Sequence, residues 1–448
     1  MSNNRPETPI IKLFVCKNKY YFYDTYSNCI FNVTKEQFIE LEQLYNIGVG
    51  SYIGLHKNEK DYNDIISLID KGLLRNDIVK SIKHIETDYV KHMLKRHISD
   101  ICLQVTKQCN FKCRYCLYTN EHGLERTHEN INMKWNVAKR ALDYLYYHSC
   151  DSEQIGISFY GGEPFINFNL IKKVVEYSNS LFYSKPIEYR VTTNGSLLSD
   201  DVIEFIVKNE FNLAISFDGD EPIQNKHRKF GSTGTGTFET VFRNIMKIKQ
   251  KSKNYFNRNV SFISVFFDDE NQEEVLRFFE NNGIAKDMVL LEDAALGGVD
   301  YIPIISNKTK TSSSYGYNLF ANLYANKGVI PPVWHHNGPC IPGIKKLFVD
   351  TEGVLYPCEK IVEHNCLSIG DLSNGINIDR VIAFMNIAKL SEDECRTCWA
   401  MRFCDICVAS CNDVNNNCVS SEQKRLACYY VRQKALKHMK NYIGIHDQ

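Results

Sequence analysis

Cysteine is the residue that most restricts how this chain can fold. The sequence holds 17 cysteines, an odd number, and ten of them lie at or beyond Cys340. A secreted scaffold held by disulfides is normally shorter and carries an even number. Clustered cysteines in an intracellular chain more often bind metal ions or iron–sulfur clusters. Because the chain after about residue 315 also has weak apolar periodicity, we expect metal centres to organise it.

The overall composition excludes several classes of protein. Lys and Arg number 53, as do Asp and Glu, so the net charge gives no reason to expect nucleic acid or a membrane as partner. The longest apolar stretches, such as residues 260–267, are far shorter than the roughly 20 residues of a membrane-spanning helix. The N-terminal residues show no secretory signal. We therefore expect a cytoplasmic protein.

The central part of the chain, from about residue 98 to residue 296, alternates strand-like runs with amphipathic stretches. The predicted strands are residues 101–105, 155–159, 189–193, 213–217, 260–267 and 288–291. Six β–α alternations predict an α/β fold, with a parallel sheet covered by helices in an open or partial barrel. In such a fold the reactive groups lie just beyond the carboxyl ends of the strands.

The first 95 residues predict a small α+β module. Alternating residues in IIKLFVCKNKYYFYD indicate two short strands around a turn at Lys17–Lys19. The segment VTKEQFIELEQLY predicts a helix with Thr34 as its N-cap. A second amphipathic helix is expected in DYNDIISLIDKGLLRND, ending at Gly72. The polar stretch 306–314 is a candidate linker to the cysteine-rich end.

Three cysteines stand just after the first predicted strand of the central part, in the run Cys109-Asn-Phe-Lys-Cys113-Arg-Tyr-Cys116. Three thiolates this close together, on a loop at the carboxyl end of a strand, can converge on one inorganic cluster. A cubane has four irons, so three cysteines leave one iron open to a ligand from outside the protein. A zinc loop completed by a distant residue is the alternative.

The C-x3-C-x2-C spacing, with Tyr115 before the last cysteine, resembles the signature of the radical S-adenosylmethionine (SAM) superfamily. Gly161-Gly162-Glu163-Pro164, at the end of the second strand, resembles that family's GGEP motif. The fourth strand runs into Ser216-Phe-Asp218-Gly219, and His227-Arg228 follows. This region resembles the family's S-x-D-G…H-x-x-R pattern, although here His and Arg are adjacent.

The resemblance implies one [4Fe–4S] cluster on Cys109, Cys113 and Cys116, with SAM bound beside it. In the family, the GGEP segment holds the methionine amino group. Ser216 and Arg228 would contact the ribose and the methionine carboxylate. The expected SAM-binding residues are Tyr115, Gly161, Gly162, Glu163, Asn194, Ser216 and Arg228. No catalytic residue is assigned.

The C-terminal cysteines resemble the SPASM domain, which binds two auxiliary [4Fe–4S] clusters. The run Cys340-x12-Gly353-x4-Cys358 matches the first half of its pattern, and Cys395-x2-Cys398-x5-Cys404 matches the start of the second. The next cysteine of the family pattern falls at position 408, which is Val here. Cys407 or Cys411 must therefore supply the displaced ligand.

The same resemblance assigns the remaining ligands. The inner cluster, nearer the active site, takes Cys340, Cys358 and one of Cys407 or Cys411. The outer cluster takes Cys395, Cys398, Cys404 and Cys428, with Cys418 as the alternative to Cys428. Position 346, where some SPASM proteins carry an extra ligand, is Lys. The inner cluster is therefore expected to have an open iron, unless Cys366 or the second of the Cys407/Cys411 pair closes it.

The other four cysteines are expected to be structural. Cys16, Cys29, Cys102 and Cys150 lie in predicted strands or at a helix end, so each is predicted to be a buried thiol.

The N-terminal module resembles the winged-helix-like RiPP recognition element, with which maturases of ribosomally made peptides grip a leader. The predicted domains are then the recognition module (1–95), a partial (β/α)6 TIM-type radical SAM barrel (96–300), a bridging region (301–334) and the SPASM domain (335–448). A structural cap on the barrel is the alternative for the module. DNA binding is disfavoured because VTKEQFIELEQLY is net acidic.

As a whole, the chain resembles radical SAM–SPASM peptide maturases of the sactipeptide and ranthipeptide type. These enzymes join a cysteine sulfur to a carbon of another residue in a precursor peptide. The expected partners are a cysteine-rich precursor with a leader and a reductant such as flavodoxin or ferredoxin, with no nucleic acid or membrane. The alternatives are an anaerobic sulfatase-type maturase, a C–C cross-linking maturase and a zinc-binding peptide scaffold without enzymatic activity.

Overall fold

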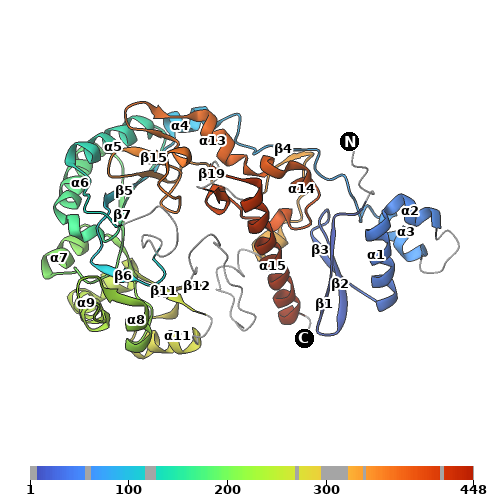
Figure 1. Ribbon diagram of the computed structural model, residues 1–448, viewed down its shortest axis with the longest axis horizontal. Helices are drawn as coiled ribbons and strands as arrows, with labels where there is room; N and C mark the ends of the chain where they lie inside the picture. Colours follow the sequence, from blue (N-terminus) through green and yellow to red (C-terminus); the bar gives the residue numbers. More distant parts are fainter. Residues whose placement is uncertain are drawn as a thin grey trace.

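The computed structural model describes residues 8–55, 62–116, 128–267, 272–293, 321–336, 340–413 and 418–446. An arc of strands and helices forms one end of the molecule, and the N-terminal module forms the other, with the long helix α15 between them (Figure 1). The candidate linker 306–314 lies outside the described residues. Within these ranges, every helix is too short or too polar to cross a membrane.

All six strands predicted in the central part are present. They are β5 (Asp100–Thr106), β7 (Ile155–Gly161), β8 (Ile187–Thr193), β9 (Asn212–Ser216), β11 (Val260–Phe266) and β12 (Val289–Asp293). Each pairs in parallel with the next in this order. The carboxyl ends of the strands therefore meet at one edge of the sheet, as the predicted α/β fold requires.

Helices cover the outer side of this sheet (Figure 1). They are α5 (Trp135–His148), α6 (Phe168–Leu181), α7 (Asp200–Lys208), α8 (Glu221–His227), α9 (Phe238–Lys251), α10 (Lys253–Asn259) and α11 (Gln272–Asn281). Ala138, Leu142 and Leu145, which share one face of α5, are fully buried against the strands. Because apolar residues at this spacing lie on one side of a helix, α5 packs on the sheet with that side.

The sheet continues beyond β5 into the cysteine-rich part of the chain, which the sequence did not predict. The added strands are β14 (Leu347–Val349), β15 (Val354–Tyr356), β16 (Gly370–Asp371) and β17 (Gly375–Ile376). β14 is parallel to β5, whereas β15, β16 and β17 are antiparallel to their neighbours. The sheet is therefore mixed, and the cysteine-rich part is joined to the central part by backbone pairing.

The cysteine-rich part also contains α13 (Ile378–Met385), α14 (Glu392–Arg396) and α15 (Ser421–His446). The sequence did not predict α15, because the apolar periodicity of this part of the chain is weak. Its inward-facing residues recur every three or four positions: Lys424, Cys428, Arg432, Ala435, Met439 and Ile443. The first three line a cavity with cysteines, and the last three pack on the N-terminal module. Because half of the stripe is polar or thiol, the sequence shows no apolar helical face.

The N-terminal module holds an antiparallel sheet and three helices. Its elements are β1 (Ile11–Cys16), β2 (Lys19–Asp24), β3 (Cys29–Val33), α1 (Lys35–Ile47), α2 (Val49–Leu55) and α3 (Tyr62–Asp70). Thr34 and Gln37 form a reciprocal capping box at the start of α1, which confirms the predicted N-cap. Gly72, with φ of 81°, follows the end of α3 as expected. β3 and α2 were not predicted.

Both faces of this small sheet are covered. Phe22 packs with Leu41 and Leu44 of α1 on one face. Tyr21 and Tyr23 point to the other face and pack with Met439 of α15. Alternate residues of β2 thus enter two different cores, as the period of a strand requires. The module is therefore docked on the C-terminal helix and does not hang free.

The junction between the module and the central part is also packed. β4 (Ser81–Ile82) pairs with β13 (Val333–Trp334), and α4 (Val90–Arg96) contributes Val90 and Leu94 to the core of the central part. Removal of residues 1–95 would therefore take buried side chains away from two other regions. Such a deletion is a poor test of what the module binds.

Candidate active site and cysteine centres

The loop that carries Cys109, Cys113 and Cys116 is fastened to the carboxyl edge of the sheet. Its short strand β6 (Phe111–Cys113) pairs antiparallel with β10 (Arg228–Phe230), so that Cys113 stands opposite Arg228. The edge-on contact of Phe111 with Phe230 supports this pair from one side. The β6–β10 pairing therefore brings two predicted site residues, over 100 positions apart, to the same place.

Gly161 and Gly162 are needed where β7 ends, because the cysteine loop presses against them. A Cβ on Gly161, whose φ is 141°, would lie 2.0 Å from the backbone oxygen of Thr106. A Cβ on Gly162 would lie 2.2 Å from the oxygen of Gln108 and 3.0 Å from the Cβ of Cys109. The two glycines thus allow close backbone approach between the strand end and the loop.

Glu163 ties the second strand end to the third. Its carboxylate accepts hydrogen bonds from the Thr193 hydroxyl at 2.8 Å, from the Asn194 backbone N–H at 2.7 Å and from the Phe165 N–H at 3.2 Å. The side chain is fully buried, and burial raises its pKa to about 7 against these three donors. Glu163 therefore supports the site from behind, through Asn194.

The raised pKa of Glu163 predicts a pH dependence of stability. The folded chain holds this proton more tightly than the unfolded chain, where a glutamate titrates near 4.3. Its contribution is therefore full at low pH and is lost as the pH rises through about 7. Between pH 5 and pH 8, the unfolding free energy should fall by about 2–3 kcal/mol more than in Glu163→Gln. Urea unfolding at both pH values measures this; equal slopes for the two proteins would contradict it.

Arg228 is held by Asp218 in a buried, two-point ion pair. Nε and Nη2 of Arg228 donate to the two carboxylate oxygens at 2.9 and 3.0 Å. The Tyr115 hydroxyl donates to the same carboxylate at 2.8 Å, and the guanidinium lies 5.2 Å from the Tyr115 ring centre. Asp218 was quoted in the motif but not predicted as a site residue; an Asp-Gly pair after a strand was the signal for it.

Asn194 and Ser216 occupy the same edge of the sheet. The Asn194 side chain donates to the oxygen of Asn110 at 2.9 Å and lies 4.0 Å from the sulfur of Cys109. Ser216 is the last residue of β9 and is half-buried. The predicted SAM-binding residues thus gather around the cysteine loop, although the ligand contacts themselves remain predictions.

His128 lies beside the cysteine loop, and no sequence motif predicted it as a site residue. Its Nε2 lies 3.7 Å from the sulfur of Cys116, and its Nδ1 donates to the backbone oxygen of Lys107 at 3.2 Å. Burial lowers the pKa of this imidazole. A neutral ring with Nδ1 protonated presents the Nε2 lone pair to the thiol.

The chemistry of the three cysteines fits an iron–sulfur cluster. Burial raises the pKa of Cys113 to about 12 and raises that of Cys109 further. Without a metal ion, Cys109 and Cys113 are therefore neutral thiols. Iron would deprotonate them, because a coordinated thiol loses its proton outright.

A second group of cysteines lines one cavity between α14 and α15. The four cysteines are Cys395, Cys398, Cys404 and Cys428. These are the predicted ligands of the outer cluster, and Cys428 from α15 takes the place for which Cys418 was the alternative. Val79 and Ile82, which precede the central part, also line this cavity.

Lys424 gives an electrostatic reason to expect an anion in this cavity. The residue is 1% exposed, and its ammonium group donates to the Ser391 hydroxyl at 2.6 Å and to the sulfur of Cys395 at 3.0 Å. A buried ammonium is stable only beside negative charge. A cluster held by four thiolates is anionic and would supply that charge. The donor set and Lys424 therefore fit an iron–sulfur cluster.

A third group contains Cys340, Cys358 and Cys407. Burial raises the pKa of Cys340 and Cys358, and both thiols also interact electrostatically with Cys407. Cys407 therefore lies near this pair, and its place as the third ligand of the inner cluster stays a prediction. Lys346, at the position of an extra ligand in some SPASM proteins, forms an ion pair with Glu359 beside Cys358.

The remaining cysteines fall into two classes. Cys411 is fully buried in the main core, where burial raises its pKa to about 12. Cys366 and Cys418 are joined to each other in a disulfide. Among the predicted structural thiols, Cys16 and Cys102 are buried, whereas Cys29 is half-buried and Cys150 is exposed. The predicted burial was wrong for Cys150, because the turn that follows α5 leaves this side chain exposed.

Comparison with known families identifies the central part. Residues 103–281, which hold the cysteine loop and the strand ends around it, match the family model of the Radical SAM superfamily. The β/α part of the chain is therefore a radical SAM domain. Proteins of this superfamily use SAM and a [4Fe–4S] cluster.

The relatives include enzymes of more than one activity. The chain is 21% identical over 375 residues to the radical SAM cyclopropyl synthase TigE of Paramaledivibacter caminithermalis, with 78% of this chain and 76% of that protein covered. A cysteine-type anaerobic sulfatase-maturating enzyme of Clostridium perfringens is 24% identical over 342 residues, covering 68% of this chain and 87% of that protein. An uncharacterized protein of Methanocaldococcus jannaschii is 35% identical over 154 residues, and the chain spans 47% of its length.

A solved structure confirms the fold. Native anSMEcpe with bound AdoMet superposes with a TM-score of 0.54 and 19% identity, over 78% of this chain and 99% of that chain. At this identity the likeness concerns the fold, a radical SAM α/β architecture with a mixed sheet.

Proposed function

We propose that the chain is a radical SAM enzyme that joins a cysteine sulfur to a carbon of another residue in a ribosomally made precursor peptide. The observation that supports this most is the combination, in one packed body, of a radical SAM domain, two further cysteine groups and an N-terminal sheet module. A radical SAM domain alone serves many reactions, whereas the added parts suit a peptide substrate.

Three [4Fe–4S] clusters and SAM are the proposed cofactors. The first cluster binds Cys109, Cys113 and Cys116, the inner cluster Cys340, Cys358 and Cys407, and the outer cluster Cys395, Cys398, Cys404 and Cys428. When bound, the first cluster and SAM supply a radical that can remove a hydrogen atom from a peptide carbon. A low-potential donor such as flavodoxin or ferredoxin provides the electron.

The chain's own residues hold the site and exclude water. Glu163 fixes the ends of two strands, and Asp218 fixes Arg228 and Tyr115 beside the cysteine loop. Such rigid support keeps the reacting groups aligned. Lys346, at the sequence position of an extra ligand in some SPASM proteins, is paired with Glu359. The cysteine of the peptide could then bind the open iron as thiolate.

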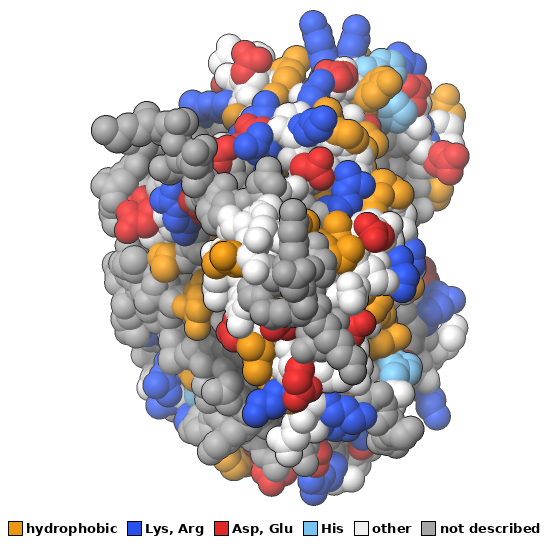
Figure 2. Space-filling view, turned by 90° about the vertical axis from the view of Figure 1, so that its right-hand side faces the viewer, with side chains coloured by type: hydrophobic (Ala, Val, Ile, Leu, Met, Phe, Trp, Pro, Cys, Tyr) orange, Lys and Arg blue, Asp and Glu red, His pale blue; other side chains and the backbone are white. Residues whose placement is uncertain are grey.

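The N-terminal module is the proposed site for the peptide's leader. β3 is an edge strand of the three-stranded sheet, and an extended peptide can pair with such an edge. Lys, Arg, Asp and Glu are interspersed over the described part of the face on the module's side of the molecule (Figure 2). This mixture does not form the basic face that nucleic-acid binding would need.

Hydrogen exchange can test the edge-strand role without damaging the fold. We expect backbone amides of β3 to exchange at least about tenfold more slowly when the precursor peptide is bound, because pairing protects them. The amides of β2, in the middle of the sheet, serve as the internal control and should not change. Unchanged exchange in β3, with protection elsewhere on the chain, would return the module to a structural role.

Mass spectrometry of a modified peptide tests the reaction itself. The substrate is a small cysteine-containing peptide encoded beside this chain, incubated anaerobically with reconstituted enzyme, SAM and reductant. Each thioether should lower the mass by two hydrogen atoms and remove one cysteine from alkylation. The same mass loss with all cysteines still open to alkylation would instead support a C–C cross-link. Zinc in place of iron and sulfide would support the non-enzymatic scaffold.

Anaerobic sulfatase maturation is the second candidate function. It is favoured by the similarity to sulfatase-maturating enzymes and by the fold shared with anSMEcpe. A peptide from a sulfatase, containing its target cysteine or serine, is the matched control substrate in the same assay. If the enzyme modified the sulfatase peptide and not the precursor, the result would support anaerobic sulfatase maturation.

A further inference from the structure

We propose that His364, Cys366 and Cys418 form a separate mononuclear metal site that binds Zn²⁺ once the Cys366–Cys418 disulfide is reduced. The proposal goes beyond the three cysteine groups described above, none of which uses these residues. It rests on the proposed function only for the reducing conditions under which the protein would work.

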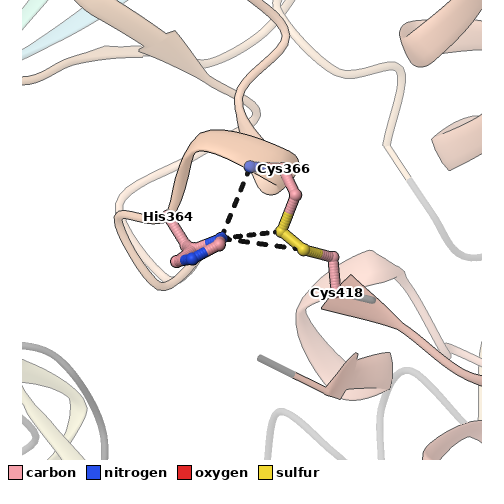
Figure 3. Close-up of side chains that lie close together, drawn as sticks. All are labelled: His364, Cys366 and Cys418. Atoms are coloured by element: carbon pink, nitrogen blue, oxygen red, sulfur yellow. Dashed lines mark hydrogen bonds between the residues drawn. A yellow bond between two sulfur atoms is a disulfide. The ribbon is translucent and has the colours of Figure 1, made fainter. Parts of the chain in front are cut away.

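The three side chains already face one another (Figure 3). Nδ1 of His364 lies 2.8 Å from the sulfur of Cys366 and 3.7 Å from that of Cys418. One ligand atom from each residue falls within 4.8 Å of the other two. Cys418 is separated from Cys366 by 52 positions in the sequence, so the site depends on the tertiary fold.

A backbone hydrogen bond shows that Nδ1 of His364 carries a lone pair and not a proton. His364 precedes a single 3₁₀ turn, Asn365–Leu367, and its Nδ1 accepts a hydrogen bond from the backbone N–H of Cys366 at 3.5 Å. An atom that accepts a hydrogen bond carries no proton of its own. The unprotonated Nδ1 also lies close to both sulfurs. Zn²⁺ would take the lone pair that now accepts the long hydrogen bond from Cys366, and that bond would be given up.

The surroundings place the site beside the radical SAM domain. The neighbouring carboxylate of Glu363 accepts a hydrogen bond from the Gln104 amide at 2.7 Å and pairs with Lys107 at 3.8 Å. Both partners lie at the carboxyl end of β5, just before the cysteine loop. Glu363 therefore anchors the loop that carries His364 to the candidate active site.

The proposed electron donor determines whether Cys366 and Cys418 are a disulfide or two thiols. In the structure the pair is a disulfide (Figure 3). A ferredoxin-type iron–sulfur protein is a low-potential electron donor. Such a donor can deliver two electrons to the bond, which takes up two protons and gives two thiols.

Zinc then fits the charge and the geometry. Zn²⁺ would displace the two thiol protons and bind two thiolates and a neutral imidazole, so that the complex carries no net charge and suits a partly buried position. Tetrahedral zinc with bonds of about 2.3 Å to sulfur separates two thiolates by about 3.8 Å. The Cα atoms of Cys366 and Cys418 are 5.9 Å apart, which leaves room for that separation.

The number of protein ligands points to a site that can exchange ligands. Structural zinc sites normally have four protein ligands, whereas sites that bind water or substrate have three. His364, Cys366 and Cys418 supply three. The fourth position is therefore assigned to water or to a small ligand with a soft donor atom such as a thiol.

Metal analysis of the cluster-loaded protein tests the proposal. The holoenzyme is reduced with dithionite, given one equivalent of Zn²⁺ and freed of unbound metal, and zinc, iron and sulfide are then counted. We expect one zinc per chain in the wild type and less than about one tenth of that in Cys366→Ser or Cys418→Ser, because zinc needs both thiolates. Zinc-edge X-ray absorption should show two sulfur neighbours. Cys150→Ser, at an exposed thiol outside every cysteine group, is the matched control and should keep its zinc.

Three results would overturn the assignment. The first is equal zinc in the wild type and in Cys366→Ser. The second is a loss of iron in Cys366→Ser, which would mean that the pair serves a cluster. The third is a disulfide that survives dithionite, seen as two fewer titratable thiols. None of these readouts uses activity, so zinc bound by a protein that leaves every peptide unmodified would contradict only the proposed function.

Discussion

Replacing Cys109, Cys113 and Cys116 together by alanine is expected to abolish SAM cleavage completely. The three thiols are the proposed ligands of the SAM-binding cluster, and they converge on one loop at the carboxyl edge of the sheet. Alanine offers no ligand, so the cluster cannot assemble. Iron should fall from about twelve to about eight atoms per chain, because one of three cubanes is lost. Release of 5′-deoxyadenosine under dithionite is the measurement.

The two other cysteine groups make this prediction specific. They lie in the cysteine-rich part of the chain, and the outer group has a cavity of its own. Their cluster spectra should therefore persist in the triple variant. Cys102→Ala, at a buried thiol of β5 on the same strand as the loop, is the control and should keep full cleavage. If the triple variant still formed 5′-deoxyadenosine, the first cluster would be assigned to the wrong residues.

The helices and strands predicted best were those whose apolar residues all face the same hydrophobic core. Most of the six central strands alternate buried apolar residues with less buried ones, and helices such as α5 carry one apolar stripe, so each pattern has one structural solution. The site residues at the strand ends followed from the same logic, because parallel strands bring their carboxyl ends together. The turn at Lys17, with positive φ at Lys17 and Asn18, was marked by the alternation on both sides.

The elements that were missed lie between two environments or depend on distant partners. α15 faces a cysteine cavity over its first half and an apolar sheet over its second, so its stripe is not apolar throughout. The strands β14 to β17 are two or three residues long and gain their stability by joining a sheet that forms elsewhere in the chain. The meeting of His364 with two cysteines is likewise tertiary. No local spacing encodes such contacts.

The supporting role of Asp218 belongs to the same class. The motif marked it as a turn residue, whereas the fold makes it a buried acceptor for groups from three separate segments. Arg228 and Tyr115 donate to it from the site, and the backbone N–H of Val265 donates at 3.0 Å from β11. The Asp218 carboxylate, just after the end of β9, therefore joins the cysteine loop, β10 and β11.

Replacing Asp218 by alanine is expected to lower the unfolding free energy by about 3–5 kcal/mol, because it leaves a buried guanidinium unpaired. The two side chains are 0% and 6% exposed, so water cannot take the place of the carboxylate. Removing both charges in Asp218→Ala/Arg228→Met should cost clearly less than the sum of the single changes, since neither partner is then left charged and alone. Urea unfolding of the cluster-free protein measures all four members of this cycle.

The exposed pair of Arg96 and Asp151 provides the matched control for this cycle. Its two side chains are 42% and 34% exposed, and the ions lie 2.6 Å apart. Water can solvate either ion when the other is removed, so Asp151→Ala should lower the unfolding free energy far less than Asp218→Ala. A cost for Asp218→Ala as small as that for Asp151→Ala would show that the buried pair does not hold the site together.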